Sequence, residues 1–149
     1  MAERSILFVD DEASFRTLTS RELARAGYRV EQAGNLTEAR RALGRQGFDL
    51  VLLDVRMPDG SGLDMLPEIR ELWPATEVVM LTAYGTVEEA IRAMKQGAHD
   101  FLTKPCRLSE LEAVLAKALE KQALQRSHDA LSRDVQRMSP STAIIGETS

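Results

Sequence analysis

Leu-Val-Leu-Leu-Asp-Val-Arg-Met-Pro, residues 50–58, is the stretch that decides the fold. Its first four residues are continuously apolar, which is typical of a strand covered on both faces of a parallel sheet. Val-Val-Met-Leu, residues 78–81, repeats this pattern further along the chain. Shorter apolar or β-branched segments on either side predict three more strands. The five predicted strands are Ser5–Val9, Tyr28–Glu31, Leu50–Leu53, Glu77–Leu81 and His99–Leu102.

Helices are predicted between these strands, because apolar residues recur there three or four positions apart. The segments Asn35–Glu38 and Thr86–Glu89 have the spacing of a capping box, which marks a helix start. A fifth helix is expected to begin near Leu108. Five strand–helix repeats predict an α/β fold in which a parallel sheet carries helices on both faces. Ligands bind such sheets beyond the carboxyl ends of the strands, so the residues after each strand are the candidates for chemistry.

The composition suits one compact domain with a short appendage. The chain has 149 residues, of which 44% are hydrophobic, and a formal net charge of −4. This acidic balance argues against nucleic acid or an anionic membrane as the main partner. Cys106 is the one cysteine and cannot form an intrachain disulfide, so a reducing compartment fits best. We interpret this residue as a small buried hydrophobe rather than a redox sensor. Without a leader segment or an apolar run near the roughly 18 residues of a spanning helix, the sequence predicts a soluble, cytoplasmic protein.

Polar residues follow four of the predicted strands. Carboxylates crowded at one sheet edge repel each other unless a cation lies among them, and Mg²⁺ suits such an all-oxygen site. With a hydroxyl and an ammonium nearby, the edge has what phosphoryl transfer to a carboxylate nucleophile needs. Taken singly, each residue also fits a structural role, such as a helix cap or a solvated lysine, and only their coincidence favours chemistry. The residues are Asp10, Asp11, Asp54, Thr82 and Lys104.

At these positions the sequence resembles the receiver domains of two-component response regulators. The resemblance covers about residues 4–120 and implies a flavodoxin-like fold with five parallel strands in the order 2-1-3-4-5. The matching segments are Ile-Leu-Phe-Val-Asp-Asp-Glu (6–12), Leu-Leu-Asp-Val-Arg-Met-Pro-Asp-Gly-Ser-Gly (52–62), Leu-Thr-Ala-Tyr-Gly (81–85) and Ala-His-Asp-Phe-Leu-Thr-Lys-Pro (98–105).

The resemblance also implies a role for each residue of the site. Asp54 would accept a phosphoryl group from a sensor histidine kinase. Asp11 and Asp54 would bind Mg²⁺ directly, Asp10 would do so directly or through water, and the carbonyl of Arg56 would be a further ligand. The side chains that hold the phosphoryl oxygens would be Thr82 and Lys104.

A conformational switch is implied in the same way. Thr82 would move towards the phosphoryl group, and Phe101 would turn inward into the space left behind. This would remodel the surface formed by the fourth helix, the fifth strand and the fifth helix. The alternative for Phe101 is a permanently buried core aromatic. In this family the peptide bond Lys104-Pro105 is usually cis, which would direct the lysine into the site.

The sequence divides into a receiver domain at residues 1–120, a helical coiled-coil linker at 121–140 and the start of a truncated output domain at 141–149. Asp-Val-Arg-Met-Pro, the helix after the receiver and a terminal Ile-Ile-Gly-Glu resemble NtrC-like regulators, whose next domain is an ATPase that activates sigma-54 RNA polymerase. A phosphate-binding loop and a DNA-binding segment are both missing. The chain alone is therefore expected neither to hydrolyse ATP nor to bind DNA.

A homodimer held partly by the fifth helix and its extension is expected. Apolar residues of the fifth helix that precede the linker have the same spacing as the linker stripe given below, but the two stripes are one position out of phase. We therefore expect a register adjustment near Glu120–Ala123. The alternative is a frayed, monomeric tail that has the coiled-coil pattern in its sequence but does not form a coiled coil. Residues of the linker stripe alternate spacings of four and three, as in a two-stranded coiled coil: Leu124, His128, Leu131, Val135 and Met138.

Two other functions remain open at this stage. A Mg²⁺-dependent hydrolase resembling the haloacid dehalogenase group would use an aspartyl phosphate for turnover, but such enzymes carry Asp-x-Asp after one strand. Here Asp10 and Asp11 are adjacent and Asp54 has no such neighbour. A degenerate receiver that serves only for dimerisation would not need the complete set of site residues.

Overall fold

The computed structural model describes residues 3–83 and 85–138, and it describes 126–138 by their backbone alone. Five parallel strands form one sheet in the order β2-β1-β3-β6-β7, which confirms the predicted order 2-1-3-4-5. The strands of this sheet are β1 (Ser5–Val9), β2 (Arg29–Ala33), β3 (Leu50–Leu53), β6 (Glu77–Thr82) and β7 (Asp100–Thr103). A two-stranded antiparallel hairpin, β4 (Arg56–Met57) with β5 (Gly60–Ser61), was not predicted.

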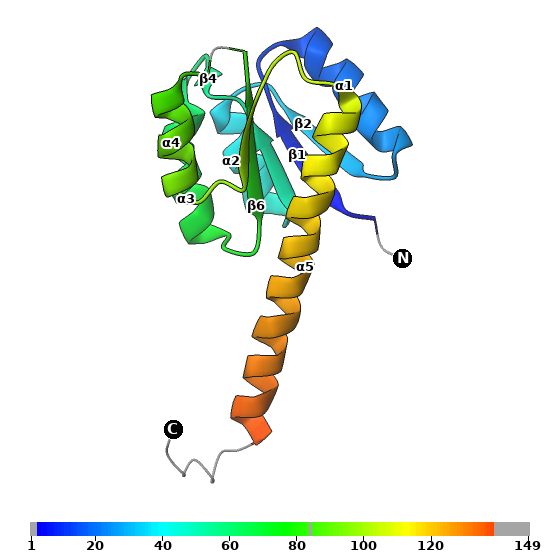
Figure 1. Cartoon of the computed structure of the whole chain (residues 1–149), viewed down its shortest axis with the longest axis vertical. Helices are drawn as coiled ribbons and strands as arrows, with labels where there is room; N and C mark the ends of the chain where they lie inside the picture. The colour runs from blue at the N-terminus through cyan, green and yellow to red at the C-terminus, as the bar shows by residue number, and fades with distance from the viewer. Residues whose placement is uncertain (1–2, 84, 139–149) are drawn as a thin grey trace.

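Helices cover both faces of the sheet (Figure 1). They are α1 (Ala13–Arg25), α2 (Leu36–Arg45), α3 (Gly62–Leu72), α4 (Val87–Lys95) and α5 (Leu108–Met138). Successive strand residues point to opposite faces, so Leu7 and Val51 pack beneath α2, α3 and α4, whereas Phe8 and Leu52 pack beneath α1 and α5. No helix in the described part of the chain is both long and apolar enough to cross a membrane.

The inner strands β1 and β3 match their predicted bounds, the inner strand β6 ends one residue later than predicted, at Thr82, and both edge strands differ. β2 begins one residue later than predicted and continues to Ala33, because all five of its residues pair with β1 from Ser5↔Arg29 to Val9↔Ala33. Its register is set by that pairing, whereas its own side chains, except that of Ala33, are exposed or only half-buried. Tyr28 instead lies between β2 and the turn after α1, in which Gly27 has a φ of 104° that other residues rarely adopt.

The helix α5 is uninterrupted through residues 120–123 and extends well beyond the sheet (Figure 1). Its upstream apolar stripe is buried in the domain's own core, so that stripe is not available to a second copy. Leu111, Leu115 and Ala118 are 0–3% exposed. Leu124, the first residue of the expected linker stripe, is 67% exposed. His128, Leu131, Val135 and Met138 lie in the helix, but their side chains fall outside the description, as do residues 139–149.

A buried glutamine anchors α5 where the helix leaves the sheet. Gln122 is 1% exposed and lies seven residues after Leu115, in line with the apolar stripe. Its amide nitrogen donates to Oδ1 of Asp49 at 3.1 Å, and its amide oxygen accepts from Arg4. Asp49 Oδ2 in turn accepts from the backbone N–H of Ser5 at 2.8 Å. The amino-terminal edge of the sheet is thus tied to α5 by polar contacts.

Candidate functional site

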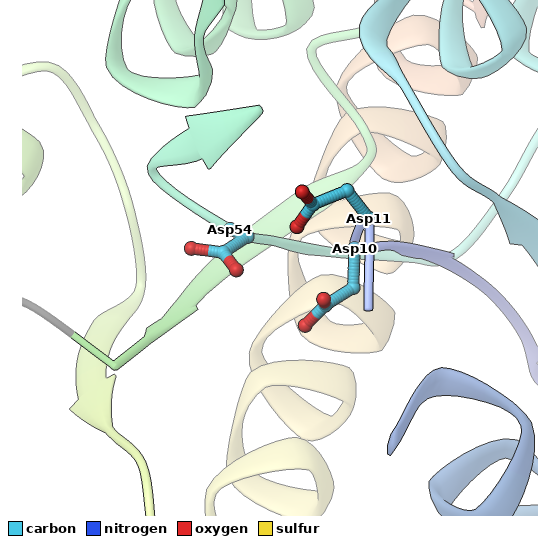
Figure 2. A group of neighbouring side chains, drawn as sticks. All are labelled: Asp10, Asp11 and Asp54. Atoms are coloured by element: carbon cyan, nitrogen blue, oxygen red, sulfur yellow. The ribbon is translucent and has the colours of Figure 1, made fainter. Parts of the chain in front are cut away.

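Three carboxylates meet at the carboxyl edge of the sheet. Asp10 and Asp11 directly follow β1, and Asp54 directly follows β3, the neighbouring strand. One oxygen from each residue lies within 4.8 Å of the others, and Figure 2 shows the three side chains gathered at the ends of their strands. Asp10 is fully buried and Asp54 is 6% exposed, while Asp11 faces solvent. Such a set of hard oxygen ligands fits Mg²⁺.

Lys104 brings a positive charge to these carboxylates from β7. Its Nζ lies 2.6 Å from Oδ2 of Asp10 and 3.3 Å from Oδ2 of Asp54. The backbone N–H of Lys104 donates to the carbonyl of Thr82 at 2.8 Å, which fixes the end of β7 beside the end of β6. The bond Lys104-Pro105 is cis, as expected. The ammonium also lies 4.4 Å from the ring centroid of Phe15, a cation–π distance.

The site's protonation follows from burial and charge. Burial raises the pKa of Asp10, and the nearby Lys104 ammonium offsets this only in part. Burial alone would lower the pKa of Lys104, but its hydrogen bond to Asp10 and the charge of Asp54 raise that pKa above its usual value. The lysine is therefore charged at neutral pH. A divalent cation among the carboxylates would favour the ionised form of Asp10.

An open cavity of about 330 Å³ lies over this cluster. Thr82, the last residue of β6, is 1% exposed and faces it from the strand next to Asp54. The structure therefore brings the sequence-predicted residues together. Asp10 does not line the cavity itself, but it contacts Lys104, which does. The residues that line it are Asp11, Glu12, Asp54, Arg56, Thr82, Ala83 and Lys104.

Phe101 lies beside Thr82 and is half-buried. It pairs with Met80 across the sheet and packs against the core beneath α4. A Cβ placed on Gly85 would be 2.6 Å from Cε1 of Phe101 and 3.2 Å from Cγ2 of Thr82. The aromatic ring therefore lies directly over the backbone of Gly85, next to the threonine methyl group. Phe101 is not a fully buried core aromatic in this structure.

Sequence reasoning assigned no role to Gly62, which determines the shape of the segment 54–62 that follows β3. Its N–H donates to the carbonyl of Val55 at 2.7 Å, and a Cβ there would lie 2.1 Å from the carbonyl oxygen of Asp54. Only glycine permits this approach. The sequence feature that could have indicated this role is the segment Asp-Gly-Ser-Gly at 59–62, whose glycines allow the tight turn of the hairpin β4–β5. The backbone N–H of Arg56 also donates to Oδ1 of Asp54 at 3.3 Å.

Two further residues complete the surroundings. Asp59 caps α2, because its carboxylate accepts from the N–H groups of Leu36 at 2.9 Å and Thr37 at 3.1 Å, and these hydrogen bonds lower its pKa. Cys106 was expected to be buried and is only partly so. The short loop between β7 and α5 leaves it at the margin of the core. The pKa of the Cys106 thiol is raised to about 11, mainly by partial burial and to a lesser extent by the hydrogen bond to Glu110 and the charge of that residue. This raised pKa disfavours a reactive thiolate.

Comparison with known proteins identifies the class that this sheet and acidic cluster define. Residues 6–116 match the model of the response regulator receiver domain, and the chain belongs to that family. It is 47% identical over 119 residues to the response regulator protein PilR of Pseudomonas aeruginosa, a match that covers 80% of this chain and 27% of PilR. The DNA-binding transcriptional regulator NtrC of Bradyrhizobium sp. (strain RP501 Parasponia) is 39% identical over 119 residues, or 80% of this chain and 25% of NtrC.

A solved relative has the same fold. The solution structure of the beryllofluoride-activated NtrC4 receiver domain dimer superposes with a TM-score of 0.76 and 35% identity, covering 79% of this chain and 98% of that one. The present chain spans about a quarter to a third of the length of the curated relatives it matches.

Proposed function

We propose that Asp54 accepts a phosphoryl group from a phosphohistidine of a sensor histidine kinase, in a Mg²⁺-dependent reaction that switches an attached output domain. The observation that carries this proposal is the contact of Lys104 with both Asp10 and Asp54 over an open cavity. A buried ammonium beside two carboxylates can neutralise the oxygens of an incoming phosphoryl group.

The metal ligands in this proposal are the carboxylates of Asp10, Asp11 and Asp54 and the backbone carbonyl of Arg56. Mg²⁺ supplies charge neutralisation and orientation for the phosphoryl oxygens when bound. A carboxylate oxygen of Asp54 attacks phosphorus, the bond from phosphorus to the histidine nitrogen breaks, and the imidazole leaves with its electron pair. Lys104 and Thr82 hold the transferred oxygens. Chemistry is limited to phosphorylation and dephosphorylation of this one aspartate, so the chain is no metabolic enzyme.

The output of the switch is proposed to pass through Thr82 and Phe101 to the surface of α4, β7 and α5. The ring of Phe101 is half-buried next to the threonine methyl, so a small movement of Thr82 changes the space open to it. We propose that the exposed face of α5 and the extension of this helix pair with a second copy, and that the next domain is a sigma-54-interacting ATPase. The dimeric state of the NtrC4 receiver relative supports the first part, and similarity to NtrC supports the second.

Incubation with acetyl phosphate and Mg²⁺, followed by intact mass measurement, tests the assignment of Asp54. The wild-type protein should gain one phosphoryl group, and Asp54→Asn should gain none because the amide is a poor nucleophile. The matched control is Asp64→Asn, which removes a carboxylate that is 72% exposed on α3 and should be phosphorylated normally. Phosphate release with continuous turnover would favour the hydrolase instead. An unmodified wild-type protein would favour the degenerate receiver.

A further inference from the structure

An ion pair joins the acceptor loop, which we define as residues 54–62, to the start of α4. Arg56 lines the cavity, and its Nη2 lies 3.5 Å from Oε2 of Glu89. The backbone N–H of the same arginine donates to Oδ1 of Asp54 at 3.3 Å. One residue therefore contacts the acceptor carboxylate through its main chain and α4 through its side chain.

Glu89 also holds the first turn of α4 together. Its Oε1 accepts from the N–H of Thr86 at 3.2 Å, and its own N–H donates to Oγ1 of Thr86 at 3.1 Å. This reciprocal pair is a capping box, which satisfies two backbone donors at the helix start. Because the second carboxylate oxygen faces Arg56, the helix start is fastened to the acceptor loop.

The ion pair is weak enough to be exchanged. The side chains of Arg56 and Glu89 are 51% and 23% exposed. Pairs this accessible to water change an equilibrium constant by at most about fivefold. A phosphoryl group on Asp54 would add a charge of about −2 and several strong acceptor oxygens. A guanidinium at the rim of the same cavity would then have a stronger partner than a single carboxylate.

We propose that Glu89 is a resting-state partner of Arg56, and that a phosphoryl group on Asp54 draws the guanidinium away from Glu89 and frees the start of α4. The inference rests on the proposed phosphorylation of Asp54. It adds a second connection between the site and α4, separate from the one through Thr82 and Phe101. In this scheme Arg56 binds the phosphoryl group, and Glu89 is a positioning residue that competes for it.

Titration with beryllofluoride and Mg²⁺, followed by calorimetry, tests the competition. Glu89→Gln keeps the capping box, since glutamine serves at that position, but removes the charge that holds Arg56. The variant should bind beryllofluoride up to about fivefold more tightly. The matched control is Glu88→Gln, which removes an exposed carboxylate from the same helix turn and should leave the affinity unchanged.

A double-mutant cycle separates competition from a general charge effect. Arg56→Met keeps the backbone carbonyl but removes the guanidinium, so it should weaken beryllofluoride binding. In that background Glu89→Gln should have no further effect. Amide exchange over residues 86–95 should speed up when beryllofluoride is added to the wild-type protein, and should already be fast in Glu89→Gln.

Two results would overturn the inference while leaving the phosphorylation of Asp54 intact. One is equal affinity in Glu89→Gln and Glu88→Gln. The other is a gain from Glu89→Gln that persists in the Arg56→Met background. If the wild-type protein gained no phosphoryl mass from acetyl phosphate, the proposed function and this inference would fail together.

Discussion

The ammonium nitrogen of Lys104 lies 2.6 Å from Oδ2 of Asp10, a carboxylate 94 positions earlier in the sequence. Both side chains are almost fully buried, at 10% and 0% exposure. The contact spans the sheet edge from the loop after β1 to the end of β7. A single substitution at Lys104 therefore changes the charge balance of the whole carboxylate cluster.

Replacement of Lys104 by methionine should slow phosphorylation from acetyl phosphate on the order of 100-fold, the usual effect of removing one charge-stabilising donor. The apolar stem can still pack against Phe15, so the fold should survive. Initial rates of mass gain measure the effect. Lys95→Met, which removes an exposed lysine from α4, is the control and should phosphorylate at the wild-type rate. Equal rates in both variants would exclude Lys104 from the transfer step.

Asp10→Asn should stabilise the metal-free protein at neutral pH. Burial raises the pKa of Asp10 in the folded state, so the folded protein binds this proton more tightly than the unfolded chain does. The contribution of Asp10 to the free energy of unfolding therefore rises as pH falls through the raised pKa towards the ordinary value near 3.8. Urea unfolding of both proteins from pH 7 to pH 4 measures this.

The stability difference between Asp10→Asn and wild type should narrow on acidification and also narrow when Mg²⁺ is added at pH 7, because the metal binds the folded wild-type protein. A difference that stays constant across the pH range would contradict the raised pKa. If the stability difference were the same with and without Mg²⁺, Asp10 would not be a metal ligand.

Gly62→Ala should destabilise the protein by about 2 kcal/mol, as overpacked sites do, and should lower phosphorylation because the Asp54 backbone must shift. The new methyl carbon would start 2.1 Å from the Asp54 carbonyl oxygen. Gly44→Ala is a matched control, since nothing lies within 4 Å of a Cβ there and alanine favours the helix α2. Chemical denaturation and mass gain are the two readouts. A Gly62→Ala variant as stable and active as Gly44→Ala would contradict the close approach.

Sedimentation at micromolar concentration, with and without beryllofluoride, tests the expected dimer. Leu131→Lys places a charge in the linker stripe and should favour the monomer, whereas Ser132→Lys places the same charge off the stripe and should not. A wild-type monomer in both states would refute dimerisation. A dimer that beryllofluoride leaves unchanged would keep the contact but remove its role in switching.

The sequence was most informative where burial is complete. The inner strands β1, β3 and β6 are buried along their whole length. The predicted bounds of β1 and β3 are those of the structure, and those of β6 differ only at its end, where the strand includes Thr82. The edge strands β2 and β7 are half-exposed, so their apolar signal is weak and their ends are fixed by pairing with a neighbour. The acidic cluster was predictable because parallel strands end at one edge, which gathers residues that are far apart in sequence.

Features that depend on side-chain contacts between elements could not be predicted in this way. The pair Arg56–Glu89 leaves no periodic pattern in the sequence. The close fit of Gly62 against Asp54 is local, and the glycines at 60 and 62 predict a turn but not that contact. Gln122 is a similar case, since a glutamine in a polar helix extension predicts exposure. The buried amide of Gln122 is paired with Asp49 and Arg4, which directly precede β3 and β1 and are far from Gln122 in the sequence.

The polar anchor at Gln122 makes movement of α5 stepwise. A shift by one residue would turn the helix by about 100° and bring Ala123 to the place of the glutamine, taking the amide away from Asp49 and Arg4. Both hydrogen bonds of the Gln122 amide are lost together in such a shift. A movement of the extension that displaces α5 against the sheet would therefore have to break both of them, at the point where the helix leaves the domain.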